Sequence, residues 1–261
     1  MVLLGAFLFA LFGLGREAFA ALVALVVLAA GHEWAGLTRM RGAARWGYAA
    51  AMVAAYGLLA WAWLGGLPAD WLYGLACVFW LAVVPTWIAR GVREHENASL
   101  RWAGPIVIVP AAVAMVELHP GPLLAALALP WVADTAAYFA GRAWGRRKLA
   151  PSVSPGKTIE GAAAGLVAVA AYAMICPRWL PQLAPVSSGA GLAVLLGASL
   201  VLGVLSIYGD LFESAVKRQA GAKDSGTLLP GHGGVLDRID SLTSTLPVVA
   251  LLSLLMLRGQ G

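Results

Sequence analysis

The sequence predicts an all-α, polytopic membrane protein with about nine transmembrane helices. Of its 261 residues, 61% are hydrophobic and 12% are charged, whereas soluble domains have about 45–50% and about 25%. The hydrophobic residues are concentrated in nine stretches, most of them near the roughly 20 residues that a helix needs to cross a bilayer core. This composition excludes a water-soluble globular enzyme and a disordered chain.

The nine stretches follow one another with short connections between them. They cover residues 1–14, 18–37, 44–66, 70–89, 102–119, 121–140, 158–176, 188–208 and 236–257. The first is short, so it requires little tilt, local thinning of the bilayer, or residues lost upstream. It lacks the basic segment of a cleavable signal peptide and is followed by further spans. Cys77 and Cys176 lie inside apolar stretches, which excludes a disulfide framework and a cysteine-based zinc site.

The basic residues predict the orientation of the chain. Fourteen of the 18 Lys and Arg fall in or beside four alternate connections: Arg39, Arg41, Arg45, Arg90, Arg93, Arg101, Arg142, Arg146, Arg147, Lys148, Lys157, Lys217, Arg218 and Lys223. By the positive-inside rule, these connections and the N-terminus are cytoplasmic, and the C-terminus is on the far side. The net charge of +5 then reflects topology and attraction to anionic lipid headgroups. We expect no nucleic-acid partner.

The acidic residues divide the chain into two regions. Residues 1–120 are predicted to be a transmembrane scaffold of about five spans. Residues 121–261 are predicted to be a catalytic region with cytoplasmic loops at 141–157 and 209–236. Seven of the 13 acids follow residue 130, and four lie within or at the edge of a span: Asp134, Asp210, Asp237 and Asp240. Because ionisable groups at membrane depth are costly, they are candidates for function.

The segment 209–241 has the richest pattern of polar residues. Asp210, Glu213, Ser214 and Lys217 recur at helical spacing and share one face, opposite a largely apolar one. Asp237 and Asp240 again share a face at the start of the last span. Between the two helices, Gly231, Gly233 and Gly234 flank His232, and such a loop lets backbone N–H groups approach an anion.

These residues are the components of a site for phosphoryl or nucleotidyl transfer. Carboxylate oxygens near a helix end suit Mg²⁺, which binds through one or two carboxylates together with substrate phosphates. Lys217, Arg218, Lys223 and Arg238 supply cations for phosphate oxygens. The alternative is a solvated basic loop with ordinary charges at its helix ends. That alternative does not explain the carboxylates that continue into the spans.

A second polar segment covers residues 131–161. Asp134, Tyr138 and Arg142 are spaced along one helix face, and a cationic loop follows them. The alternative interpretation of Asp134 is a buried carboxylate paired with Arg142 for helix packing. Gly156-Lys157-Thr158 resembles the end of a P-loop. We reject that motif because Pro151 stands where it needs glycine and no strand precedes it.

Two further features favour structure over chemistry. For His32, Glu33 and Trp34, at the end of the second span, an interfacial anchor is favoured over a site. Gly161 and Gly165 form a small-xxx-small pair, which is typical of close helix packing.

Residues 214–240 resemble the signature of the phosphatidate cytidylyltransferases (CDP-diacylglycerol synthases). The matching positions are Ser214, Lys217, Arg218, Lys223, Asp224, Pro230, His232, Gly233, Gly234, Asp237, Arg238 and Asp240. The segment 131–161 is similar to this family through Asp134, Thr135, Tyr138, Gly141, Arg142, Gly145, Pro151, Ser154, Pro155, Lys157, Thr158, Glu160 and Gly161. Glu33-Trp34 resembles the family's early Glu-Trp pair. The resemblance is strong over about 131–241 and weak before it.

The resemblance implies a multi-pass enzyme of the bacterial inner membrane, usually a homodimer. It implies condensation of CTP with phosphatidic acid to give CDP-diacylglycerol and pyrophosphate, with Mg²⁺ and room for a second cation. Asp210 and Asp237 match the metal-binding aspartates. The catalytic motif falls on Ser214, Lys217, Arg218, Lys223, Asp224, His232, Arg238 and Asp240. The substrate-binding candidates are Asp134, Arg142, Ser154, Lys157, Thr158 and Glu160.

The sequence differs from the family pattern in three ways. Gly156 replaces a common lysine, and Ile159 replaces a common tryptophan. The basic residues that usually precede the first span are absent, so either Met1 is not the natural start or this span is atypical. Two other functions stay open. One is a cytidylyltransferase or kinase for another lipid phosphate or polyprenol. The other is a phosphate or cation transporter, although transporters often carry paired broken spans in two repeated halves.

Overall fold

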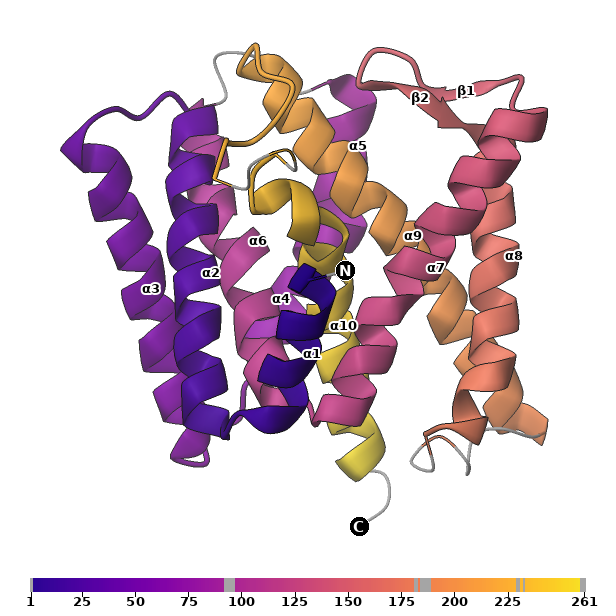
Figure 1. Cartoon of the computed structure of the whole chain (residues 1–261), viewed down its shortest axis with the longest axis horizontal. Helices are drawn as coiled ribbons and strands as arrows, with labels where there is room; N and C mark the ends of the chain where they lie inside the picture. The colour runs from indigo at the N-terminus through magenta and orange to yellow at the C-terminus, as the bar shows by residue number, and fades with distance from the viewer. Residues whose placement is uncertain are drawn as a thin grey trace.

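The computed structural model describes residues 2–91, 97–180, 183, 189–228, 231 and 233–258. In these residues the chain forms a bundle of helices with one small hairpin at its upper edge in Figure 1. Eight helical segments are long and apolar enough to cross a membrane. The predicted all-α polytopic fold class is therefore confirmed.

The helices follow the predicted stretches within a few residues at most ends. They are α1 (Val2–Gly13), α2 (Arg16–Leu37), α3 (Ala43–Leu64), α4 (Asp70–Val78), α5 (Val84–Arg90), α6 (Asn97–Glu117), α7 (Pro120–Trp144), α8 (Ile159–Ile175), α9 (Gly189–Gln219) and α10 (Leu236–Arg258). A π-helical stretch, Phe79–Val83, joins α4 to α5, so the two form one span. A 3-10 turn, Cys176–Arg178, follows α8.

The first of the nine predicted stretches differs from the others. It forms α1, but this helix has 12 residues and therefore rises about 18 Å. That is well short of the roughly 30 Å hydrocarbon core. The described residues thus hold eight candidate spans and one short helix rather than nine spans.

The boundaries of the two predicted loops are wrong. Helix α7 continues to Trp144, and strands β1 (Lys148–Ala150) and β2 (Ser154–Thr158) form an antiparallel hairpin within the predicted loop 141–157. Helix α9 continues to Gln219, so the first third of the predicted loop 209–236 is helical. Strands of three and five residues are too short to show a periodicity in the sequence, which is why the hairpin was not predicted.

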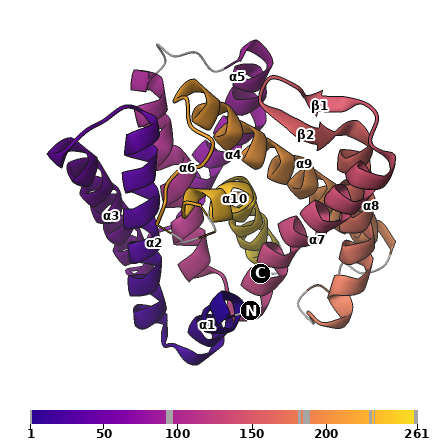
Figure 2. The ribbon, with the colours of Figure 1, turned by 45° about the horizontal axis from the view of Figure 1, so that its top comes forward.

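Helix α10 is the central helix of the bundle. It packs against α9, α6, α4 and α7, and Figure 2 shows it surrounded by them. Two hydroxyls join it to α9, because Ser241 Oγ donates to Ser206 O at 3.3 Å and Ser244 Oγ donates to Leu205 O at 2.7 Å. Hydroxyl groups in membrane helices commonly bond across helix interfaces in this way. They fix the two helices that carry most of the candidate residues.

An aromatic cluster around Phe212 holds the apolar face of α9. Its ring lies 5.5–6.3 Å, centroid to centroid, from those of Trp34, Phe79, Trp80 and Trp87. Phe212 is 1% exposed, and ring pairs at these separations attract beyond their buried area. This packing sets the rotation of α9, so its polar side chains turn toward α10 and the hairpin.

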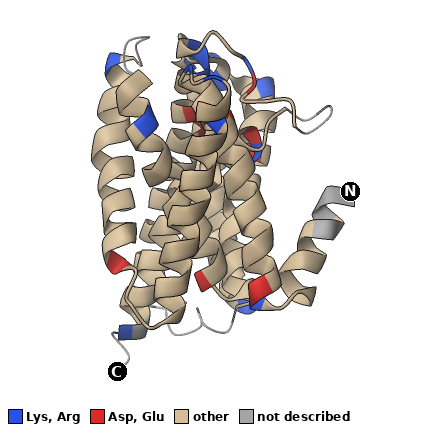
Figure 3. Ribbon diagram, turned by 90° about the vertical axis from the view of Figure 1, so that its left-hand side faces the viewer, with Lys and Arg blue, Asp and Glu red and all other residues tan. Residues whose placement is uncertain are grey.

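Helices α7 and α8 pack closely through two glycines. A Cβ at Gly161 would lie 2.7 Å from the carbonyl oxygen of Ala137, and one at Gly165 would lie 3.0 Å from that of Ala133. The prediction that these glycines mark a helix contact is confirmed. The contact places the hairpin, which connects α7 to α8, at the end of the bundle where Figure 3 shows most Lys and Arg.

Candidate active site

Asp237, in the first turn of α10, lies at the centre of the candidate site. One carboxylate oxygen accepts hydrogen bonds from Ser225 N and Ser225 Oγ, both at 2.9 Å, and from Gly234 N at 2.8 Å. The other pairs with Lys217 Nζ at 2.5 Å. The side chain is 9% exposed. The predicted metal ligand is therefore held in one orientation by the 225–234 loop and by α9.

Glu33 of α2 braces the same loop from the opposite side. Its carboxylate accepts from Val235 N at 3.0 Å and from Leu236 N at 2.9 Å, at the start of α10. Its second oxygen also lies 3.0 Å from Ser225 Oγ. Glu33 is 1% exposed, so the interfacial anchor predicted for it is wrong. The region 1–120 contributes directly to the site and is not scaffold alone.

Lys217 bridges two carboxylates across the interface of α9 and α10. Its ammonium lies 2.9 Å from Glu213 Oε2 and 2.5 Å from Asp237 Oδ1. Glu213 is 4% exposed, and its Oε1 is buried without a hydrogen-bond partner among the described residues. The spacing predicted one polar face for these residues, and the structure places both Glu213 and Lys217 on it.

Asp210 connects α9 to the hairpin. Its Oδ2 pairs with Lys157 Nζ at 2.5 Å, and its Oδ1 accepts from Ser214 Oγ at 3.2 Å. Asp134 of α7 and Asp240 of α10 lie within electrostatic reach of both Lys157 and Asp210. The two polar segments predicted from the sequence therefore meet in space, with Lys157 as their junction.

The remaining residues of the 131–161 segment hold the hairpin in place. Thr158 caps α8 by accepting from Gly161 N at 3.1 Å, and Glu160 accepts from the backbone N–H of Arg146 and Arg147. Arg142 donates to Tyr138 at 3.1 Å, so the alternative pairing of Arg142 with Asp134 is not present. Direct substrate contacts of Arg142, Ser154, Thr158 and Glu160 remain a prediction.

The other predicted catalytic residues differ in exposure. Arg218 donates to Val153 O of the hairpin at 3.4 Å and to Ala222 O at 3.3 Å. Lys223, Asp224 and Arg238 are exposed around the mouth of the loop. His232 lies outside the described residues. The structure thus brings Ser214 and Asp240 close to Asp210 and Lys217 close to Asp237, whereas Arg218 contacts the hairpin and the loop.

Comparison with known proteins decides the family. The model of the cytidylyltransferase family matches residues 1–256. The chain belongs to this family. Family membership covers both halves of the bundle, including α2 with Glu33, where resemblance by motif alone was weak.

Proteins from several bacteria are similar to the chain. It is 49% identical to the phosphatidate cytidylyltransferase of Pseudomonas aeruginosa over 154 residues, which are 57% of the chain and 55% of that protein. It is 44% identical to the phosphatidate cytidylyltransferase of Staphylococcus aureus over 130 residues, 50% of the chain and 48% of that protein. It is 39% identical to the uncharacterized protein YnbB of Escherichia coli over 187 residues, 71% of the chain and 55% of that protein. The matches span about half the length of these relatives.

The side chains of this cytidylyltransferase-family site are of the chemical type that binds a divalent cation, because most of them are carboxylates. In the part of the chain that the structure describes, five carboxylates interact with one another and with Lys157 and Lys217; they are Asp134, Asp210, Glu213, Asp237 and Asp240. Among the described residues, no three acidic, His or Cys side chains already surround one point as ligands. However, the orphaned Glu213 oxygen and the excess of hard oxygen donors are what a Mg²⁺-binding site needs before its substrate phosphates arrive.

Gly209 sets the distance between the two helices of the site. A Cβ there would lie 2.6 Å from Asp240 O and 2.7 Å from Ser244 Oγ. We expect Gly209→Ala to push α9 from α10 and to lower the free energy of unfolding by about 1–3 kcal/mol. Thermal unfolding in detergent measures this. The control is Gly197→Ala on the same helix, where a Cβ meets nothing within 4 Å; equal stability of the two variants would contradict the account.

Proposed function

We propose that the chain condenses CTP with phosphatidic acid to give CDP-diacylglycerol and pyrophosphate. The observation that carries the proposal is the buried cluster of carboxylates and lysines with Asp237 at its centre. It is built from the signature residues of the family and lies at the basic end of the bundle. The names of the relatives in Pseudomonas aeruginosa and Staphylococcus aureus support the same substrates.

The proposed reaction is an in-line displacement. A phosphate oxygen of phosphatidic acid attacks the α-phosphorus of CTP, a new P–O bond forms, and the bond to the β-phosphate breaks. The electron pair of that bond leaves with pyrophosphate. Because phosphatidate is already anionic near neutral pH, no side chain has to remove a proton from it, and we assign no general base.

In this proposal the lysines and carboxylates have separate roles. Lys157, on the hairpin, and Lys217, on α9, lie where they neutralise phosphate oxygens. Glu213 and Asp237 orient Lys217 through its two hydrogen bonds. Asp210 and Asp237 would hold Mg²⁺, and Asp240 or Glu213 a second cation. When bound, the metal supplies stabilisation of the charge that develops on the phosphates.

The same proposal places the protein in the bacterial inner membrane as a homodimer. The basic end of the bundle (Figure 3) would face the cytoplasm, by the positive-inside rule, where CTP is present. Phosphatidate would lie in the adjoining leaflet. The anionic substrate headgroup and the nucleotide would then approach the site from the same side.

The fate of the label in CTP tests the proposed reaction against its alternatives. Purified protein with phosphatidate, Mg²⁺ and CTP labelled at the α-phosphorus is expected to yield labelled lipid. Label from the γ-phosphorus is expected to appear in pyrophosphate. Lipid labelled from the γ-position would instead establish a kinase. Label transfer to a polyprenol phosphate but not to phosphatidate would establish a different acceptor.

Lys157→Gln is expected to weaken CTP binding. The substitution removes a charge from the hairpin that reaches Asp210, and we expect the KM for CTP to rise roughly tenfold, as for loss of one charge-assisted phosphate contact. Initial rates at varied CTP measure the effect. Lys148→Gln is the matched control, because Lys148 is exposed on the same hairpin. An unchanged KM in Lys157→Gln would remove Lys157 from the nucleotide site.

A further inference from the structure

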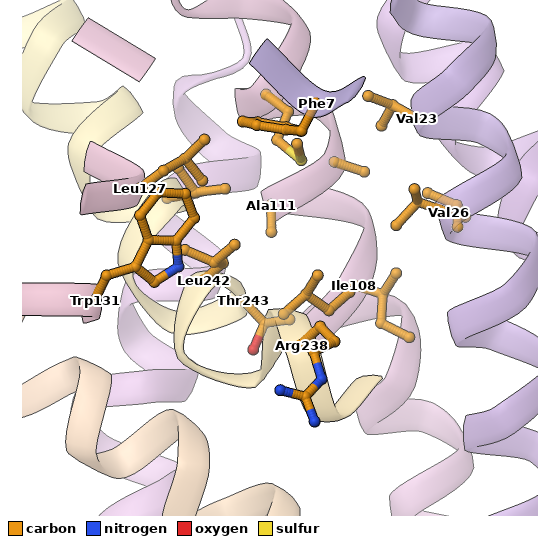
Figure 4. A pocket seen from close by; sticks show the side chains of 15 residues that line it. Phe7, Val23, Val26, Ile108, Ala111, Leu127, Trp131, Arg238, Leu242 and Thr243 are labelled. Carbon is orange, nitrogen blue, oxygen red and sulfur yellow. The ribbon is translucent and has the colours of Figure 1, made fainter. Parts of the chain in front are cut away.

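An apolar crevice lies beside the candidate active site, between α1, α2, α6, α7 and α10. It encloses about 210 Å³, and apart from Arg238 and Thr243 its lining side chains are apolar or aromatic. Figure 4 shows Arg238 at one end and Phe7 at the other. Val26 of α2 and Ala111 of α6 lie along its length.

Helix α10 carries residues of both this crevice and the carboxylate cluster, and the two meet at its first turn, where Asp237 and Arg238 lie. Successive residues of an α-helix point about 100° apart. Asp237 therefore faces Lys217, while its neighbour Arg238 lines the crevice. The crevice continues down α10 through Leu242 to Leu246, two turns and about 12 Å from Arg238. A molecule with an anionic head and a hydrocarbon tail matches this arrangement in both charge and polarity.

Water is a poor occupant of such a space. An enclosed apolar cavity of about 150 Å³ stays dry and binds benzene, and the lining of this crevice is similarly apolar. Small residues on α6, Ala111 and Ala112, leave the space open. The half-exposed Trp131 of α7 stands at the rim.

We propose that this crevice binds one acyl chain of the phosphatidate substrate and that Arg238 holds its phosphate next to Asp237. The proposal rests on the proposed function and adds the side chains that select the lipid. The chain lies along Val26, Ala111 and Leu242, and Phe7 closes the far end. The crevice then determines how acyl length affects the reaction.

Val26→Trp tests the crevice without removing any charged residue. Val26 is half-buried at the lining. We expect the KM for dioleoyl phosphatidate to rise about tenfold, the loss of roughly two buried methylene groups. We expect dihexanoyl phosphatidate, whose six-carbon chains occupy less of the crevice than oleoyl chains do, and CTP to keep their KM values.

Leu25→Trp is the matched control for this variant. Leu25 is 63% exposed and is not part of the lining. The substitution therefore adds the same ring to the lipid-facing side of the same helix. Leu25→Trp is expected to behave as the wild type. Equal effects of the two substitutions, or equal losses for long and short lipids in Val26→Trp, would overturn the proposal.

Photolabelling separates the crevice from catalysis. Phosphatidate with a diazirine on one acyl chain is expected to label α6 and α10 near Ala111 and Leu242, and Arg238→Gln is expected to reduce this labelling. Phosphatidylcholine with the same chain is expected to label them weakly. Equal labelling by both lipids would make the crevice a general lipid contact and refute the proposal. Labelling without turnover would retain the lipid site and refute the proposed function. Turnover without labelling would retain the proposed function and refute the lipid site.

Discussion

Asp237→Asn is expected to lower the rate of pyrophosphate release by about 10³-fold or more, the size of effect found when a group that stabilises transition-state charge is removed. The substitution keeps the size of the side chain but removes the charge that pairs with Lys217. Its amide would also turn an N–H group toward either an ammonium or the three donors from Ser225 and Gly234. Both the lysine and the proposed metal would lose their anchor. Initial rates with saturating CTP measure the effect.

The control for this variant is Asp70→Asn at the opposite end of the bundle. Asp70 forms an ion pair with Arg258, so the same chemical change removes a pair outside the site. It is expected to keep most of the activity. Thermal unfolding in detergent shows whether each variant is folded. A folded Asp237→Asn protein with a near-normal rate would contradict the role given to this carboxylate.

Glu33→Ala is expected to destabilise the site from the other side. The substitution leaves Val235 N and Leu236 N without their acceptor, while the hydroxyl of Ser225 keeps Asp237 as its acceptor. Each orphaned buried donor costs about 1–3 kcal/mol, so we expect a loss on the order of 3 kcal/mol or more in the free energy of unfolding. Activity is expected to fall by about 10²-fold, because small displacements of a catalytic group have effects of this size.

Three comparisons make the Glu33 prediction specific. Glu33→Gln keeps one acceptor oxygen and is expected to be intermediate in both stability and rate. Glu17→Ala, at the exposed opposite end of the same helix, is expected to match the wild type. Limited proteolysis is expected to cut Glu33→Ala within residues 220–235 more rapidly than the wild type. Wild-type proteolysis and activity in Glu33→Ala would show that the loop does not depend on Glu33.

The spans were predictable because hydrophobicity and length determine them directly. Stretches such as 18–37 and 236–257 agree with α2 and α10 within a few residues. The polar face of Asp210, Glu213 and Lys217 also followed from helical spacing alone. These features depend on residues close together in the chain, so their pattern is visible in the sequence.

Glu33 was not found because its role depends on contacts with residues about 200 positions away. The residue type alone does not distinguish a buried glutamate from one at the membrane interface. The signal that could have found it was the early Glu-Trp pair of the family, since Trp34 donates to Leu100 O and contacts Phe212 in the same packed region. The hairpin was missed for a different reason: its strands are short, and its contacts, such as Val153 with Leu211 and Ala215 of α9, are distant in the sequence.

Pyrophosphate release by the purified protein in detergent tests the central claim most directly. The account predicts release that requires CTP, phosphatidic acid and Mg²⁺ together and that is lost in Asp237→Asn. Omitting any one of the three components is expected to bring the rate to background. A folded protein that releases no pyrophosphate with all three present would contradict the proposed reaction.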